Sequence, residues 1–294
     1  MYVERYGAGG REVYFGLHGW SGDHRTFAPL AAHVPAPASL YSADLPGCGQ
    51  SPAPPALTIE TVTGEIVEAV HAALDTATTP RAQVTLIGNC SGAILGLLAA
   101  ERIKARVSRL VLVDPFAYWP WYFRVFVAGN FGRHAYRTTF ANPLGRWLTN
   151  QSLRGRRTAS TDLTHSFGRI DHDVAQRYLA LLAEVGGVER FESLGDVPVD
   201  IVYGERTFGA VKKSVGMWQG VWPGARAHVL RGAGHLPIIE ATAQLAGVIF
   251  GDDENGGANS LTAAATTEAT TEATTTAETT TEAAAQARES EARV

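Results

Sequence analysis

The sequence Val84-Thr85-Leu86-Ile87-Gly88-Asn89-Cys90-Ser91-Gly92-Ala93 begins as an apolar, partly β-branched run and leads into an Ala/Leu-rich segment. The first part predicts a buried strand, and the Ala/Leu-rich segment predicts a helix. The glycines at 88 and 92 remove Cβ atoms where a strand and the following helix must nearly touch. We therefore expect Cys90, midway between them, to take a strained and exposed conformation at the tip of a tight turn.

The spacing Gly88-x-Cys90-x-Gly92 resembles the nucleophile elbow of the α/β-hydrolase family (AB hydrolase-1 type), G-x-S-x-G, with cysteine in place of serine. This resemblance implies an α/β-hydrolase fold: a mostly parallel central sheet flanked by helices, with an inserted helical lid. It also implies that Cys90 is a catalytic nucleophile. Two alternatives stay open, which are an ordinary tight turn and an elbow centred on Ser91.

Composition limits the class of protein. The 294 residues are 45% hydrophobic, which is enough for one large α/β domain with an inserted subdomain. A net charge of −4 lacks the strongly basic character of a nucleic-acid-binding protein. The N-terminal residues show no basic-then-apolar signal region, and no run approaches the roughly 18 apolar residues of a membrane span. The expectation is a cytoplasmic protein with neither a nucleic-acid partner nor a membrane span.

The two cysteines, Cys48 and Cys90, are too few for a disulfide framework and lack metal-ligand spacing. A bridge between them would consume the proposed nucleophile and is uncommon in the reducing cytosol, so we expect free thiols. No metal or redox cofactor is implied. Residues 7–10, Gly-Ala-Gly-Gly, fail the dinucleotide pattern G-x-G-x-x-G and instead predict a hairpin turn between strands at residues 1–6 and 13–17.

Two further motifs resemble loops of the same family. His18-Gly19-Trp20-Ser21-Gly22 resembles its oxyanion loop, which implies that the backbone amides of Trp20 and Ser91 hold a developing oxyanion. The alternative is that His18-Gly19 only turns the chain, with His18 hydrogen-bonded internally. Asp44-Leu45-Pro46-Gly47-Cys48-Gly49-Gln50-Ser51 resembles the D-x-P-G-x-G-x-S loop, in which the aspartate usually shapes the loop.

The general base is expected at His235. The segment Arg231-Gly232-Ala233-Gly234-His235 matches the family's G-x-G-H turn. It follows the last predicted strand, at residues 226–230, and precedes a predicted closing helix at 237–250. A single histidine is more often structural, but one in this position is better explained as catalytic.

The acid departs from the family pattern. The family usually places it three residues after the glycine that closes the next-to-last strand, and this residue is Thr207, which cannot hold an imidazolium electrostatically. Pancreatic-type lipases of the family instead carry an Asp-Pro pair after the strand that follows the elbow, and Asp114-Pro115 stands 24 residues past Cys90. Three hypotheses stay open: Asp114 orients His235, Glu205 does so from a rearranged loop, or the site is a Cys/His dyad or degenerate. A cysteine needs the acid less than a serine does.

Residues 116–196 interrupt the strand pattern and predict the lid, inserted between core segments 1–115 and 197–250. Eleven of the chain's 26 aromatic residues lie between Phe116 and Trp147. Trp119, Trp121 and Tyr122 are expected to line a pocket for an apolar acyl group, unless these aromatics form the lid's own small core.

The expected lid is locally basic. Residues 116–170 carry eight arginines and one acid, Asp162. This pattern suggests an anionic ligand, such as a coenzyme A or carrier-protein thioester, or an acidic partner surface. Solvated helix faces, or screening by an acidic tail, explain the same charges. That tail, residues 251–294, repeats Thr, Glu and Ala without any aromatic residue and is predicted to be disordered.

These predictions describe a hydrolase or acyltransferase. Cys90 would attack an ester, thioester or lactone carbonyl, and His235 would transfer the proton. Family members with a cysteine nucleophile include dienelactone hydrolases, polyester synthases and some assembly-line thioesterases. The alternative is a catalytically degenerate protein that keeps the pocket and only binds a small molecule.

Overall fold

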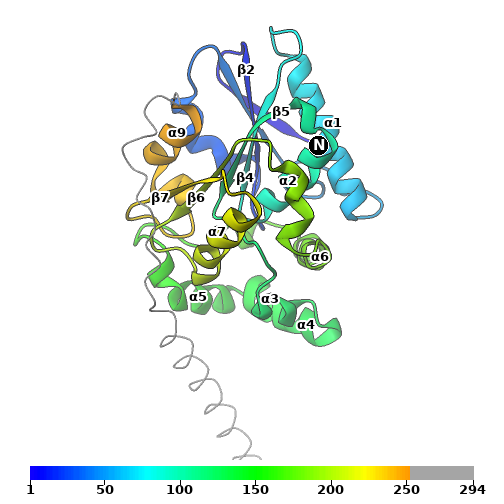
Figure 1. The fold of residues 1–294 in the computed structure, drawn as a ribbon. Helices are drawn as coiled ribbons and strands as arrows, with labels where there is room; N and C mark the ends of the chain where they lie inside the picture. The colour runs from blue at the N-terminus through cyan, green and yellow to red at the C-terminus, as the bar shows by residue number, and fades with distance from the viewer. Residues whose placement is uncertain (252–294) are drawn as a thin grey trace, which may run out of the picture. The chain divides into compact units, whose positions relative to one another are not determined.

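A seven-stranded sheet in the order β1-β3-β2-β4-β5-β6-β7 forms the centre of the computed structural model (Figure 1). β1 pairs antiparallel with β3, and every other neighbouring pair is parallel, so the predicted fold class is confirmed. The structure describes residues 1–251. Apart from Gly251, the predicted tail lies outside the described residues. The strands are β1 (Val3–Tyr6), β2 (Glu12–Leu17), β3 (Ala38–Ala43), β4 (Val84–Asn89), β5 (Val107–Val113), β6 (Val199–Gly204) and β7 (Arg226–Leu230).

The hairpin predicted between the first two strands is wrong. β2 lies between β3 and β4, whereas β1 is an edge strand that pairs with β3. Burial explains the difference, because five of the six β2 residues are buried and none of the four β1 residues is. A strand that is apolar on both faces is stabilised most inside a parallel sheet. Gly7 and Gly9, with φ of 90° and 89°, allow the connection between the two strands.

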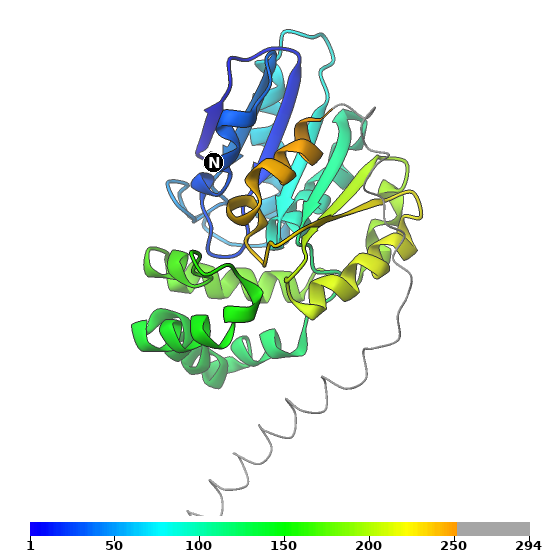
Figure 2. The same ribbon diagram turned by 90° about the vertical axis from the view of Figure 1, so that its left-hand side faces the viewer.

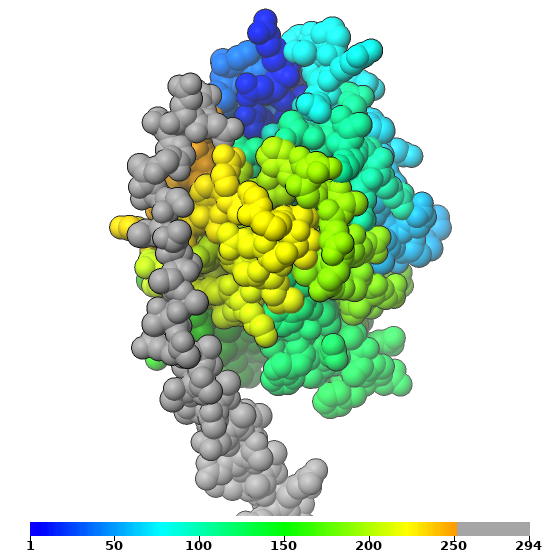
Figure 3. All heavy atoms as spheres, in the orientation of Figure 1, coloured from blue at the N-terminus to red at the C-terminus, as the bar shows by residue number. Residues whose placement is uncertain are grey.

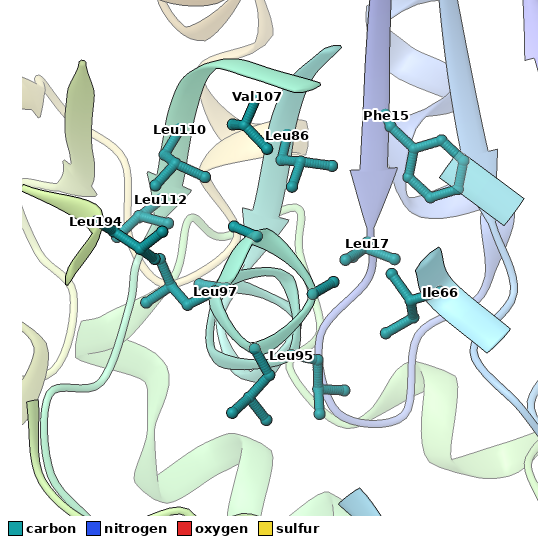
Figure 4. Packing of buried hydrophobic residues seen from close by; sticks show 14 of the residues in the cluster. Phe15, Leu17, Ile66, Leu86, Leu95, Leu97, Val107, Leu110, Leu112 and Leu194 are labelled. Atoms are coloured by element: carbon teal, nitrogen blue, oxygen red, sulfur yellow. The ribbon is translucent and has the colours of Figure 1, made fainter. Parts of the chain in front are cut away.

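Helices cover both faces of the sheet (Figure 2). On one face, side chains such as Leu97 of α2 and Phe15 of β2 belong to one large apolar cluster (Figure 4). On the other face, η1 and α9 contribute Phe27 and Ile249, and a Cβ at Gly16 would lie 2.8 Å from the Phe27 ring. None of the helices within residues 1–251 combines the length and the apolar character of a membrane span. The helices of the core are η1 (His24–His33), α1 (Ile59–Asp75), α2 (Ser91–Arg102), η2 (Lys104–Arg106), α7 (Gly209–Val221), α8 (Pro237–Glu240) and α9 (Thr242–Phe250).

The segment between β5 and β6, residues 114–198, contains helices and no strand. We call residues 116–196 the insertion. Figures 1 and 2 show its green helices beyond one end of the sheet, and Figure 3 shows its first part against the segment that contains α7. There the Ala117 amide donates a hydrogen bond of 2.9 Å to Ser214 Oγ. The insertion's helices are α3 (Trp121–Phe126), α4 (Gly129–Tyr136), η3 (Arg137–Ala141), α5 (Pro143–Ser152), η4 (Arg154–Arg156), η5 (His165–Gly168), α6 (His172–Ala183) and η6 (Val188–Leu194).

The insertion has an aromatic core of its own. Tyr136, Phe140 and Phe167 are buried together, and the Phe140 and Phe167 rings stack with centroids 4.6 Å apart. Trp20, from the loop after β2, packs into the same cluster and donates from Nε1 to the Ala175 carbonyl at 2.8 Å. The insertion is therefore fixed to the core by a residue of the predicted oxyanion loop.

A buried carboxylate joins the last three strands. Asp200 of β6 has no exposed surface and accepts hydrogen bonds from Arg109 of β5 (2.6 Å) and from Arg226 (2.9 Å) and His228 (2.6 Å) of β7. Burial alone would raise the pKa of Asp200. The hydrogen bonds from His228, Arg226 and Arg109, together with the Arg109 charge, outweigh burial and hold this pKa well below its usual range.

We expect Asp200→Asn to lower the free energy of unfolding at neutral pH by about 3 kcal/mol, because one partner of a buried charge network is removed. Denaturant unfolding measures this. Since the folded-state pKa of Asp200 is depressed, its contribution is complete above the unfolded-state pKa of about 4 and is lost as pH falls through the folded-state value. The difference between wild type and variant should therefore shrink in acid. Glu60→Gln, at an exposed pair with Arg102, is the control and should cost less than about 1 kcal/mol.

Candidate active site

Cys90 occupies the turn between β4 and α2. Its φ of 51° and ψ of −115° are strained for a non-glycine residue, and the side chain stands at the N-terminal end of α2. The two flanking glycines explain how this turn is possible. A Cβ at Gly88 would lie 2.2 Å from the Cα of Ala93, and a Cβ at Gly92 would lie 2.3 Å from the Leu17 carbonyl oxygen. The strand, turn and helix predicted from the sequence are all present.

Asp114 lies directly after β5 and contacts His235. Its Oδ2 accepts hydrogen bonds from His235 Nδ1 at 2.7 Å and from the Thr207 hydroxyl at 2.6 Å, while Oδ1 accepts from the Gly204 amide at 2.9 Å. The carboxylate is fully buried. These contacts fix the imidazole with its proton on Nδ1, which leaves Nε2 available as a base.

Thr207 stands where the family usually places its acid, and its Oγ1 lies 3.1 Å from His235 Nδ1. The carboxylate reaches the same point from the neighbouring strand, because β5 and β6 pair with Val113 opposite Val202 and therefore end side by side. The threonine donates to this carboxylate and does not replace it. Glu205 accepts from the Gly232 amide at 2.8 Å and makes no contact with His235 in the described structure.

The environment of His235 favours the imidazolium. Burial lowers its pKa, but the hydrogen bonds to Asp114 and Cys90, with the charges of these two groups, raise the pKa to about 10. The ring is held between the edges of two aromatic side chains, Phe208 at 4.5 Å and Phe116 at 6.0 Å between centroids. The geometry thus brings Cys90, His235 and Asp114 together in one chain of contacts.

The loop that carries Trp20 and the first residue of α2, Ser91, adjoin Cys90. The loop that carries Trp20 lies against the elbow, since a Cβ at Gly19 would be 3.1 Å from the Cβ of Cys90. Neither the Trp20 amide nor the Ser91 amide donates a hydrogen bond to any group within residues 1–251. Two N–H groups without acceptors can bind an oxygen that gains negative charge.

His18 is hydrogen-bonded internally and shapes this loop. Its Nδ1 donates to the Gly19 carbonyl at 2.8 Å, and its Nε2 accepts from the Leu45 amide at 3.0 Å. Burial lowers the pKa of His18, which keeps the ring neutral, as both contacts require. One alternative for the His18-Gly19 motif, an internally hydrogen-bonded ring, is present, and the oxyanion role of the Trp20 amide stays a prediction.

Asp44 also shapes a loop. Its carboxylate accepts from the His24 amide (2.6 Å) and the Gln50 amide (2.7 Å) and contacts the His24 ring. Asp23, His24 and Asp44 are the one group within residues 1–251 whose ligand atoms lie close enough for a metal ion. The Asp23 carboxylate is bound to Arg25, so the oxygens of both carboxylates already have hydrogen-bond partners.

Two cavities adjoin Ser91. The larger, of about 120 Å³, lies between the Trp20 loop, the Cys48 loop and Arg169 of the insertion. The smaller, of about 60 Å³, is mostly apolar, and its lining includes Ile94, Phe116, Trp119, Leu182, Val188 and Trp218. Space for a substrate therefore exists on two sides of the start of α2, between the core and the insertion.

Comparison with known proteins identifies the family. The family model described as alpha/beta hydrolase fold matches residues 16–242. The chain belongs to the α/β-hydrolase family. This α/β hydrolase is 27% identical over 241 residues to a pimeloyl-[acyl-carrier protein] methyl ester esterase of Neisseria meningitidis serogroup A, across 78% of its own chain and 72% of that relative.

Solved structures show the same fold. A thermophilic esterase from Thermogutta terrifontis has a TM-score of 0.66 at 18% identity and covers 84% of this α/β hydrolase and 90% of its own chain. The enol-lactonase from Burkholderia xenovorans has a TM-score of 0.60 at 17% identity and covers 84% and 94%. At these identities the likeness concerns the fold.

The three aromatic residues expected in the pocket differ in position. Trp119 lines the smaller cavity, and its Nε1 is buried without a partner in the described part of the chain. Tyr122 is half-buried, lines neither cavity, and has its pKa raised to about 12, chiefly by burial. Trp121 is 74% exposed and lines neither cavity.

Sequence analysis missed three contributors to the site of this α/β hydrolase. Thr207 was considered only as a replacement for the acid, although it is a hydrogen-bond donor to Asp114. Arg156 and Glu240 accept hydrogen bonds from the backbone amides of His235 and Gly234. No local pattern identifies these two, because their contacts join the turn to the insertion, about 80 residues away.

Proposed function

We propose that this α/β hydrolase is an esterase or thioesterase with Cys90 as its nucleophile, and that its acyl substrate is carried by an acidic carrier protein. One observation carries the proposal. A thiol on a nucleophile elbow contacts a histidine that a buried carboxylate orients, beside two amides without acceptors. The chemistry of this arrangement is acyl transfer to water.

In the proposed reaction, His235 as imidazolium already holds the proton of the Cys90 thiol, and the thiolate sulfur attacks the substrate carbonyl carbon. The carbonyl oxygen becomes negative and accepts hydrogen bonds from the amides of Trp20 and Ser91. The bond to the leaving oxygen or sulfur then breaks, and His235 gives that atom its proton. A water molecule, deprotonated by His235, attacks the thioester, and the acid product leaves as the thiol is restored.

The intact contacts of Asp114 favour an enzyme over a degenerate binding protein. A protein that only kept the pocket would have no need of a buried carboxylate with every oxygen bonded to His235, Thr207 or Gly204. Burying such a charge is costly unless it is used to hold a partner charge.

The surface of the insertion supports an acidic partner. Residues 116–161 contain no acid, and the exposed Arg124, Arg133 and Arg154 have no ion pair within residues 1–251. Five exposed large apolar side chains stand on helices α3, α4 and α5 of the same insertion: Trp121, Phe131, Leu144, Trp147 and Leu148. Exposed arginines among apolar side chains suit an acidic protein surface. The Neisseria relative is named for an ester on an acyl-carrier protein.

We expect kcat/KM for an acyl-carrier-protein ester to exceed that for the same acyl group on a short pantetheine arm by about tenfold or more at low salt. High salt should remove most of the difference, because exposed charges are screened. Steady-state kinetics with both substrates at two salt concentrations measures this. The corresponding coenzyme A ester distinguishes a carrier-protein surface from a phosphate group alone.

The matched variants are Arg124→Gln, Arg133→Gln and Arg154→Gln combined, against Arg102→Gln as the control. Arg102 is exposed and paired with Glu60 of α1, and it lies outside the helices α3, α4 and η4 that carry the three arginines. The triple variant should lose the preference for the carrier protein and keep its rate on the short substrate. Equal kcat/KM for both substrates at every salt concentration would remove the carrier protein from the proposal and leave the Cys90 chemistry in place.

A further inference from the structure

The carboxylate of Glu240 joins the turn of His235 to the insertion. Its Oε2 accepts a hydrogen bond from the Gly234 amide, next to His235 in the chain. Its Oε1 accepts from the Thr158 amide at 2.7 Å and from the Thr161 hydroxyl. Glu240 is the last residue of α8, and one side chain thus bonds to two segments that lie about 80 residues apart.

The backbone of His235 is itself bound to the insertion. The His235 amide donates to the Arg156 carbonyl at 2.7 Å, and Gly234 is so close that a Cβ there would lie 2.1 Å from the same oxygen. The Arg156 guanidinium also donates to the Thr207 carbonyl at 3.3 Å. The insertion therefore contacts both residues whose side chains bind Asp114, which are His235 through Nδ1 and Thr207 through Oγ1.

The turn needs this support. Two of its five residues are glycines, and Gly232 has a φ of 74°, so the turn has little stiffness of its own. The imidazole must face Asp114 with one nitrogen and Cys90 with the other. A displacement of about 1 Å in such an arrangement can cost about 10²-fold in rate.

We propose that Glu240 is a positioning residue that makes the productive placement of His235 depend on the position of insertion residues 156–161. When this segment is seated, Glu240 and the Arg156 carbonyl hold the turn, and His235 contacts Asp114 and Cys90. When the segment moves away, the His235 amide loses the Arg156 carbonyl, and Glu240 loses its bonds to Thr158 and Thr161. A substrate that moves or seats the insertion would thereby change the base itself. This inference rests on the proposed role of His235 as the base.

Glu240→Gln tests the proposal. A carboxamide has one acceptor oxygen, so its NH₂ must face either the Gly234 amide or the Thr158 amide, and one of the two attachments is lost. Thr161→Val is the milder variant, because it removes one donor on the insertion and leaves the Gly234 contact. The control is Glu205→Gln, in which the altered carboxylate binds the Gly232 amide of the same turn and does not contact the insertion.

We expect Glu240→Gln to lower kcat for a small soluble ester about tenfold with less than a twofold change in KM, and Thr161→Val to lower it about threefold. The Asp114 contact raises the pKa of His235. When that contact is weakened, the pKa falls, and the alkaline limb of kcat/KM should move to lower pH. Alkylation of Cys90 at mildly acidic pH should also slow, more in Glu240→Gln than in Thr161→Val. Glu205→Gln should match wild type in all three measurements.

Thermal unfolding of each variant separates positioning from general loss of structure. If kcat falls only in proportion to the unfolded fraction, or if the alkaline limb and the alkylation rate of Glu240→Gln coincide with those of wild type, the proposal is overturned. Alkylation does not require turnover, so it reports on the contact between Cys90 and His235 even if the proposed esterase function fails. A failure of that function would appear separately, as unchanged turnover in variants at Cys90.

Discussion

Replacing Cys90 by alanine is expected to remove about 10⁴–10⁶ of the rate on activated esters, because the nucleophile and the acyl-enzyme pathway are lost together. The hydrogen bond and charge that Cys90 shares with His235 place the thiol where this chemistry requires it. Turnover of p-nitrophenyl esters measures the loss, and wild type should show a burst with a thioacyl adduct on Cys90 by mass spectrometry. Full activity in Cys90→Ala would show that the thiol is not the nucleophile. Cys90→Ser should retain part of the rate, since serine fits the same turn.

Alkylation provides the control for this prediction. Both cysteines are free, as expected from the sequence. Burial, and to a lesser extent the Asp44 charge, raise the pKa of the Cys48 thiol to about 12, so Cys48 is almost entirely protonated at neutral pH. Iodoacetamide should therefore modify Cys90 first and inactivate the protein in proportion. Cys48→Ala should keep the turnover rate of wild type and should still be inactivated by iodoacetamide. Inactivation that tracks the modification of Cys48 would contradict the assignment of Cys90 as the nucleophile.

Asp114→Asn is expected to lower kcat/KM by about 10²–10⁴. The reason is the fixed arrangement of donors. The Gly204 amide requires an acceptor at the Oδ1 position, so the new NH₂ must face His235 and Thr207. An NH₂ donates to Nδ1 and so forces the ring proton onto Nε2, where His235 can no longer act as a base.

The pH profile tests the same prediction independently. With Asp114 neutralised, the pKa of His235 falls from its raised value, and the alkaline limb of kcat/KM moves to lower pH. Thr207→Val should cost less, because it removes one donor and leaves the carboxylate in place. Glu205→Gln should behave like wild type. The assignment fails if Asp114→Asn is harmless while Glu205→Gln is not, and three harmless variants would indicate a Cys/His dyad.

The elbow and the base turn could be predicted because their signals are local. Two glycines spaced around Cys90, and a glycine-rich turn before His235, specify conformations that depend on a few neighbouring residues. The sequence favoured Asp114 over Glu205 through the Asp-Pro pair, but no local pattern could show its contact with His235. That contact depends on β5 and β6 ending side by side, which is a property of strand pairing.

Other features depend on contacts that no short pattern contains. The partner of β1 is decided by how deeply β2 is buried, so hairpin-like spacing gave the wrong pairing. The aromatic count of the insertion indicated a pocket or a core but could not tell that Trp121 faces outward while Trp119 lines a cavity. The attachment through Glu240 joins distant segments, and the residues around Thr158 give no local sign of it.

Trp20 belongs to two parts of the molecule at once. It stands in the loop that lies against Cys90, while its ring packs with its centroid 4.9 Å from that of Phe140 and 4.8 Å from that of Phe167, and its Nε1 binds the Ala175 carbonyl. An engineer who grafts the insertion of another hydrolase onto this scaffold would therefore alter the Trp20 loop without touching its sequence. Exchanging substrate preference between such enzymes requires transplanting the tryptophan loop together with the helices, as one cassette.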